Sequence, residues 1–174
     1  MPFSNLRIDI NSLPRQEDLE LEPVSEKFKA VQWWNWSLLW LIIAAAFTGF
    51  LFLPKVKISM TVILCISGGL LLLAVVHKMA QLISFRHRAF ALRAHDIVYR
   101  QGWLIRKTEF CPLNRIQHCS VNAGIFERKY GLASLEVFTA GSNGADIVIK
   151  GLTTEQAEQL KEIIIKKTGQ DDKL

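Results

Sequence analysis

Residues 36–53 read WSLLWLIIAAAFTGFLFL and residues 58–76 read ISMTVILCISGGLLLLAVV, and only the segment Pro54–Lys57 separates them. Neither apolar run contains a charged side chain. As a helix, each run would extend roughly 27–29 Å, which matches the hydrocarbon thickness of a bilayer. The sequence therefore predicts two transmembrane helices, about 36–53 and 58–76, which form an antiparallel hairpin with both outer ends on one side of the membrane.

The basic residues near these runs predict the orientation of the hairpin. The connector carries Lys55 and Lys57. The other side carries six basic residues, which are Lys27, Lys29, Lys78, Arg86, Arg88 and Arg93. Because basic loops stay in the cytoplasm, we expect both termini there. Four tryptophans, at 33, 34, 36 and 40, favour an interfacial belt over an aromatic ligand cage.

Charge and hydropathy divide the whole chain into four parts. Residues 1–30 form a polar, acidic tail, and residues 31–87 hold the two helices with a juxtamembrane extension. Residues 88–168 have the composition of a soluble domain, and residues 169–174 form a polar tail. The net charge is +5, but no basic stripe interleaved with aromatics appears, so we expect no nucleic-acid partner. The three cysteines lack a CxxC pair, so we expect no metal site and no cofactor.

From residue 88 the hydrophobic pattern changes to that of short strands. We predict strands at 88–93, 97–101, 103–110, 115–121, 133–139 and 145–150, with one helical turn at 125–130. Thr153 and Gln156 have the spacing of a capping box, which predicts a C-terminal amphipathic helix. The expected fold is a small curled antiparallel sheet with that helix packed against it.

Several segments of this domain resemble one known family. They are Gly102, the run 112–118 (PLNRIQH), the run 124–135 (GIFERKYGLASL) and the run 139–141 (TAG). In this order they are similar to the bacterial pleckstrin-homology-like family, formerly a domain of unknown function. Its YdbS-type members carry two spans ahead of one such domain, as here.

The resemblance implies a fold and a set of framework residues. The fold is an α+β pleckstrin-homology-like split β-barrel, capped by the C-terminal helix and preceded by the transmembrane hairpin. The matching residues are expected to be structural, and they are Pro112, Leu113, Arg115, Ile116, Gln117, Gly124, Tyr130, Gly131, Leu132, Thr139 and Gly141. The resemblance also implies the bacterial cytoplasmic membrane. It implies no reaction, and it suggests a larger relative with repeated pleckstrin-like domains as the protein partner.

The residues themselves offer few candidates for chemistry. Neighbouring side chains on a strand point to opposite faces, so His118 and Cys119 are not expected to act as a base and a nucleophile. We therefore predict no catalytic residue, no metal ligand and no enzymatic activity. The best binding candidates are four basic residues, Arg106, Lys107, Arg128 and Lys129, which could contact lipid headgroups or an acidic partner. The competing interpretation is an ordinary solvated, charged face.

Three functional hypotheses follow. The first is a membrane-anchored binding or assembly module that acts through protein contacts. The second is a sensor of anionic lipids, and the third is an auxiliary subunit of an export or antimicrobial-peptide resistance system. Membrane lipids are a partner in every case, and a homo-oligomer remains open.

Overall fold

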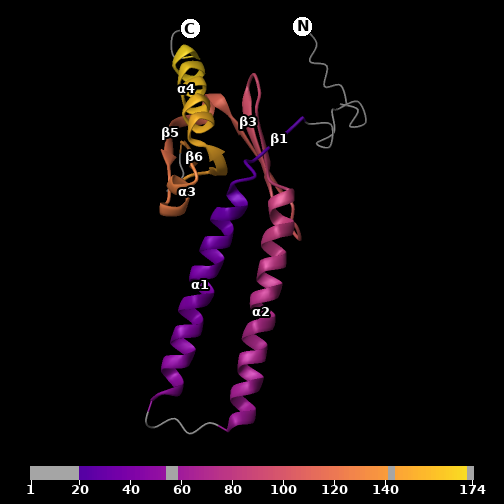
Figure 1. Cartoon of the computed structure of the whole chain (residues 1–174). Coiled ribbons are helices and arrows are strands. Elements are labelled where there is room, and N and C mark those ends of the chain that lie inside the picture. The colour runs from indigo at the N-terminus through magenta and orange to yellow at the C-terminus, as the bar shows by residue number, and fades with distance from the viewer. Residues whose placement is uncertain (1–19, 54–58, 141–143, 172–174) are drawn as a thin grey trace, which may run out of the picture.

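The computed structural model describes residues 20–53, 59–140 and 144–171 (Figure 1). Two long helices, α1 (Phe28–Leu51) and α2 (Met60–Arg86), project from one end of a small α+β domain. Both helices are long and apolar enough to cross a membrane. The predicted pair of long apolar helices is therefore present, and each helix extends beyond its apolar run into the domain.

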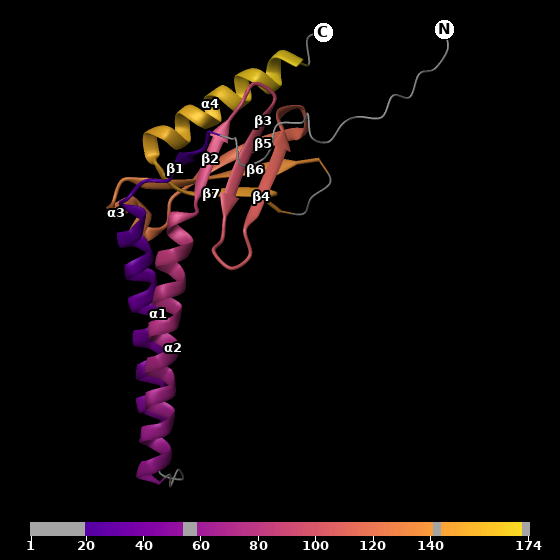
Figure 2. The same cartoon turned by 90° about the vertical axis from the view of Figure 1, so that its right-hand side faces the viewer.

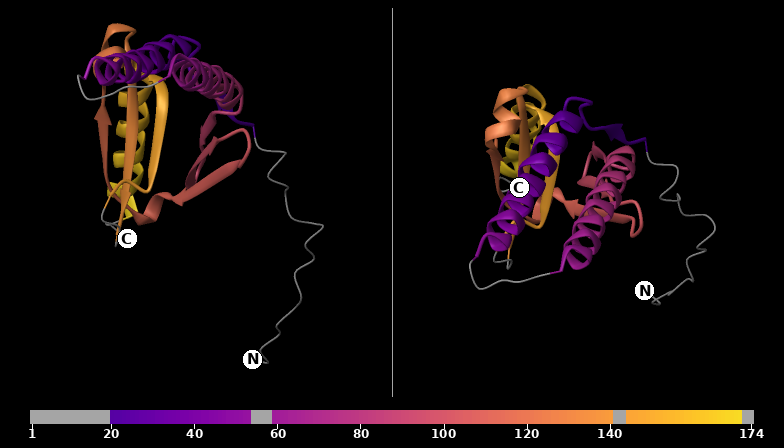
Figure 3. Two further views of the ribbon diagram at one scale, coloured as in Figure 1. Left: turned by 90° about the horizontal axis from the view of Figure 1, so that it is seen from below. Right: turned by 60° about the horizontal axis from the view of Figure 1, so that its bottom comes forward.

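The domain contains two antiparallel sheets. The first has the order β1 (Glu22–Pro23), β2 (Ala89–Leu92), β3 (Asp96–Gln101) and β4 (Lys107–Pro112). The second has the order β5 (Ile116–Asn122), β6 (Leu132–Thr139) and β7 (Ile147–Thr153). A short 3-10 helix, η3 (Leu113–Arg115), joins the sheets, and α3 (Ile125–Lys129) joins β5 to β6. From below, the sheets meet on one side and diverge on the other, as in a split barrel (Figure 3).

The transmembrane hairpin is inserted between the first two strands of the first sheet. β1 leads directly into α1, and α2 leads directly into β2, which pairs with β1. Connections in an antiparallel meander alternate between its two ends. The β3–β4 connection therefore lies at the same end as the hairpin, and the β2–β3 turn lies at the opposite end (Figure 2). We call the end that carries α1 and α2 the membrane end of the domain.

The core of the domain continues into both helices. Phe28 and Val31 of α1 and Phe85 of α2 are buried in the same apolar cluster as the strands. Gly151 of β7 permits this contact, because it has a φ of +84° and a Cβ there would lie 2.8 Å from the Phe28 ring. The helices are thus part of the packed domain and are not joined to it by a linker.

The C-terminal helix α4 (Thr154–Asp171) packs on the second sheet (Figure 1). Its capping box forms as predicted, since the Gln156 N–H donates to Thr153 Oγ1 and Thr153 N–H donates to Gln156 Oε1, both at 3.1 Å. Ala157 and Ile164 of this helix are fully buried on the face that packs on the sheet. This apolar face holds the second sheet against α4.

The structure departs from the sequence-based expectations at several points. Helix α4 continues to Asp171, past the start of the polar tail expected at 169, and β7 covers 147–153 where a strand at 145–150 was expected. Residues 103–106 form a loop instead of the start of a strand, because Gly102 turns the backbone with a φ of +95°. The predicted acidic tail at 1–30 lies outside the described residues up to residue 19. Beyond that point Glu22 and Pro23 form β1, and Val24 is buried in the core.

Gly151 gives a direct test of this continuous core. The substitution Gly151→Ala adds a Cβ against Phe28 at a backbone angle that favours glycine. We expect it to lower the free energy of unfolding by about 3 kcal/mol, measured by denaturation in detergent. Gly169→Ala is the control, because a Cβ there meets nothing within 4 Å. Equal stabilities of the two variants would contradict the described packing.

Candidate interaction surfaces

The first surface joins α1 to α3 at the membrane end. The Trp34 ring stacks on Phe126 with a centroid distance of 5.9 Å and an interplanar angle of 10°. Its Nε1–H donates a 2.8 Å hydrogen bond to Tyr130 Oη, and Lys129 Nζ lies 5.1 Å from the ring centroid. We call these four residues the α1–α3 clamp. The clamp ties the second sheet to the first transmembrane helix.

The clamp is built from local sequence features. Gly124 begins α3, and its N–H donates a 2.8 Å hydrogen bond to Glu127 Oε2. Ser134 Oγ donates a 2.9 Å hydrogen bond to the other oxygen of the same carboxylate. Gly131 ends the segment with a φ of +66°. These contacts fix α3, so that Phe126 and Tyr130 point to α1.

Two further tryptophans join α1 to α2. Trp36 Nε1–H donates to the Ala74 carbonyl at 3.2 Å, and Trp40 Nε1–H donates to His77 Nδ1 at 3.3 Å. Because Nδ1 accepts, the proton of a neutral His77 lies on Nε2, 3.1 Å from the side-chain amide of Gln81. If the Gln81 amide is rotated by half a turn, its buried Oε1, which otherwise has no partner, accepts a hydrogen bond from His77 Nε2–H. The tryptophans therefore hold the two helices together.

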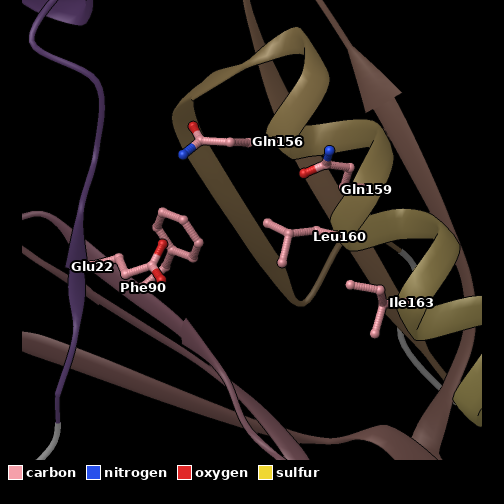
Figure 4. Close-up of a pocket in the computed structure, with 6 residues that line it drawn as sticks. All are labelled: Glu22, Phe90, Gln156, Gln159, Leu160 and Ile163. Atoms are coloured by element: carbon pink, nitrogen blue, oxygen red, sulfur yellow. The ribbon is translucent and has the colours of Figure 1, made fainter.

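The second surface is a groove between the first sheet and α4 (Figure 4). It has a volume of about 190 Å³ and lies between the β1–β2 edge and α4. Phe90, Leu160 and Ile163 form its apolar part. Its polar rim consists of Glu22, Gln156 and Gln159. The groove exists because the two sheets diverge on this side.

The four predicted basic candidates do not converge on one site. Arg106 ends the β3–β4 connection and Lys107 begins β4, beside α2, whereas Arg128 and Lys129 are the last residues of α3, beside α1 (Figure 2). Lys107 also forms an ion pair with Glu109. Both pairs are at the membrane end, on opposite sides of the helices. A single binding site that uses all four side chains is therefore not formed.

The residues of the family motif are spread over the framework of the domain. Leu113, Ile116 and Leu132 are buried. Pro112, Arg115 and Thr139 line a shallow pocket of about 270 Å³ together with Asp146. Gln117 is exposed at the irregular register between Ile116 and His118. Gly141 lies outside the described residues.

His118 and Cys119 lie on opposite sides of β5. The exposed His118 ring stacks on Phe138 with a centroid distance of 4.3 Å, whereas Cys119 packs against the core. Desolvation by burial, with a smaller effect of Cys111, raises the pKa of Cys119 to about 11. Burial likewise raises the pKa of Cys111. Neither thiol is activated, because the thiolate is the nucleophilic form.

Comparison with known proteins places the chain in a family. A family model described as "Bacterial PH domain" matches residues 31–168. The chain belongs to the bacterial PH domain family. It is also 27% identical over 92 residues to the UPF0699 transmembrane protein YdbT of Bacillus subtilis (strain 168). That match covers 52% of this chain and 19% of the relative, so the chain spans about a fifth of that protein. No solved structure matches it.

The family assignment confirms the predicted fold. A hairpin of two apolar helices precedes two antiparallel sheets and a capping helix, and the described strands form no closed barrel. The bacterial PH domain also includes most of α1 and all of α2, because the match begins at Val31. Sequence reasoning missed the α1–α3 clamp and the exposed apolar loop at 103–105. The Trp-Leu-Ile run directly after Gly102 was the available signal for that loop.

The clamp predicts a specific effect of Trp34. Trp34→Ala removes the stack on Phe126 and the hydrogen bond to Tyr130, at a cost of about 2 kcal/mol. We expect amide hydrogen exchange in α3 to accelerate roughly 30-fold. Trp33→Ala is the control, because the contact described for Trp33 is with Trp34 and not with α3. Unchanged exchange in Trp34→Ala would contradict the clamp.

The buried thiols predict slow alkylation. At pH 8 the thiolate fraction of Cys119 should be roughly 100-fold below that of an unfolded cysteine. Because its folded pKa is raised, its contribution to stability is present below pH 9 and is lost as the pH rises towards about 11. Mass spectrometry of iodoacetamide-treated protein, with Ala94→Cys as an exposed control, measures the labelling. Equal labelling of positions 94 and 119 would contradict the described burial.

Proposed function

We propose that this protein is a non-enzymatic assembly module of the bacterial cytoplasmic membrane. Its hairpin binds a transmembrane helix of a protein partner, and its PH domain is held in a fixed orientation on the cytoplasmic side. The excess of Lys and Arg next to the domain supports that orientation. The observation that carries the proposal is the set of glycines on the hairpin that the chain itself does not use.

The described hydrogen bonds between the two helices lie in the domain-side and middle turns of α1. They join Trp36 to Ala74 and Trp40 to His77. Towards the connector the helices diverge (Figure 1). The less exposed positions of α2 follow a helical seam that faces α1, formed by Ile63, Leu70, Ala74, His77 and Gln81.

Gly68 and Gly69 lie on a different face of α2 from this seam. A Cβ added at Gly49, Gly68 or Gly69 would meet no atom within 4 Å outside its own helix. Glycine costs about 1 kcal/mol in a helix relative to alanine. Small residues in membrane helices allow another helix to approach closely. Because this chain does not fill the notch at Gly68 and Gly69, we infer that a partner helix does.

A larger membrane protein of the same family is the proposed partner. The Bacillus subtilis relative is named as a transmembrane protein, and it is much longer than the segment it shares with this chain. A partner with several apolar helices could place one of them against the glycine face of α2. The fixed PH domain would then contact the soluble part of that partner, with the groove beside α4 as the available recess.

The arrangement of reactive side chains supports binding over catalysis. His118 and Cys119 point away from one another, and burial keeps the thiol protonated. Within the described ranges, no three His, Cys, Asp or Glu side chains are grouped so that they could hold a metal ion. This arrangement of side chains is therefore better suited to binding than to catalysis.

The proposal is tested by purification in a mild detergent. We expect the full chain to retain a stoichiometric membrane partner of the same family. The double variant Gly68→Leu/Gly69→Leu should reach the membrane at normal abundance, because it adds apolar volume without an internal clash. The amount of partner recovered with the variant should fall at least roughly 10-fold, because the two leucines fill the notch.

The matched control is Ala45→Leu/Ala46→Leu. These positions are exposed on α1 and add comparable apolar volume without touching the glycine face of α2, so we expect full partner recovery. Absence of any membrane partner from the unmodified chain would contradict the assembly function. Recovery of only a second copy of this chain would contradict the larger partner, and full recovery with the glycine variant would contradict the interface.

A further inference from the structure

The loop between β3 and β4 exposes three consecutive large apolar side chains. Trp103 is 42% exposed, Leu104 is 76% exposed and Ile105 is 80% exposed. Single exposed apolar residues are common on soluble domains, but a contiguous patch at the end of a hairpin indicates a contact. We call residues 102–106 the tip loop.

The shape of the tip loop is fixed by its own backbone. Gly102 has a φ of +95°, and a Cβ there would lie 2.1 Å from the carbonyl oxygen of Ile105. The loop is closed behind this turn, because Gln101 pairs with Lys107 across the hairpin. The three apolar side chains are therefore carried by a tight turn that requires glycine at position 102.

The tip loop lies beside the last turns of α2. Both Figure 1 and Figure 2 show the β3–β4 connection reaching down along the outside of this helix. This part of α2 carries Lys78 and Arg86, and the uncharged apolar run ends at Val76. The turns of α2 between Val76 and Arg86 therefore lie at the level of the lipid headgroups. The tip loop is thus at the depth where the membrane surface begins.

We propose that the tip loop inserts into the leaflet nearest to the domain. Leu104 and Ile105 enter the boundary between headgroups and acyl chains, and Trp103 lies among the headgroups, where indole is favoured. Arg106 follows directly and faces the phosphates of anionic lipids, next to Lys107, which is paired with Glu109. The occupant of this apolar surface is therefore the bilayer itself, which the adjoining helices already cross.

Insertion gives the domain a third attachment to the membrane besides α1 and α2. It also sets the tilt of the first sheet, because β3 and β4 run directly into the loop. The inference requires only the transmembrane hairpin and does not rest on the proposed protein partner. A chain without any partner in its membrane would still insert the loop.

A depth measurement on the full chain tests the proposal. We would replace the native cysteines by alanine, introduce Ile105→Cys and attach an environment-sensitive fluorophore. The protein is then placed in nanodiscs of phosphatidylethanolamine and phosphatidylglycerol. We expect a blue-shifted emission. Lipids that carry a nitroxide at the headgroup end of the acyl chain should reduce the fluorescence intensity to roughly half.

The matched control is the same fluorophore at Ala94→Cys. Ala94 is exposed in the β2–β3 turn, at the opposite end of β3 from the tip loop. Its emission should be quenched by aqueous iodide and not by the nitroxide lipids. If position 105 behaves like position 94, the proposal is overturned.

A second variant separates insertion from simple proximity. Leu104→Asp, with the fluorophore still at position 105, should abolish the quenching by nitroxide lipids and leave the signal at position 94 unchanged. Replacing phosphatidylglycerol by phosphatidylcholine should weaken the quenching without abolishing it, because the apolar contact remains. Quenching that is insensitive to Leu104→Asp would overturn the insertion.

Discussion

The packing of both transmembrane helices into the core of the domain is the constraint on which the structure depends. Phe28 and Val31 at the start of α1, and Phe85 at the end of α2, lie in the same apolar cluster as the strands. Each buried phenylalanine contributes about 2 kcal/mol of transfer free energy. An α-helix is stiff over such lengths, so the position of the hairpin in the bilayer determines the position of the domain.

This constraint explains why so many elements gather at the membrane end. Because the hairpin is inserted between β1 and β2, the antiparallel order brings the β3–β4 connection to the same end. The second sheet is held there as well, since Trp34 of α1 bonds to Tyr130 and stacks on Phe126. The four basic residues noted in the sequence are consequently divided into two pairs, one on each side of the helices.

Much of the fold could be predicted because its signals are local. Two uncharged apolar runs define the hairpin, and the alternation at Leu135, Val137, Ile147 and Ile149 defines a β-hairpin whose inward side chains are all buried. Residues 103–106 of the tip loop were wrongly predicted as strand, because Trp103 and Ile105 belong to residue types that are enriched in strands. Only the positive φ of Gly102, which a sequence does not report, separates the two conformations.

The interaction surfaces were harder to predict, because they depend on contacts between distant residues. Trp34 and Tyr130 are 96 positions apart in the chain. The unused face of Gly68 and Gly69 becomes apparent only when the side of α2 that contacts α1 is known. The sequence offered four basic candidates but could not place them relative to one another, since it contains no information on which side of the helices each loop lies.

The rigid connection between membrane and domain can be measured directly. Spin labels at Leu41→Cys, on the exposed surface of α1, and at Glu155→Cys, at the start of α4, report the distance between the two parts in nanodiscs by double electron–electron resonance. The account predicts one narrow distance distribution, no wider than that of a pair within the domain at Ala94→Cys and Glu155→Cys. A broad or multimodal distribution for the pair at 41 and 155, beside a narrow one within the domain, would contradict it.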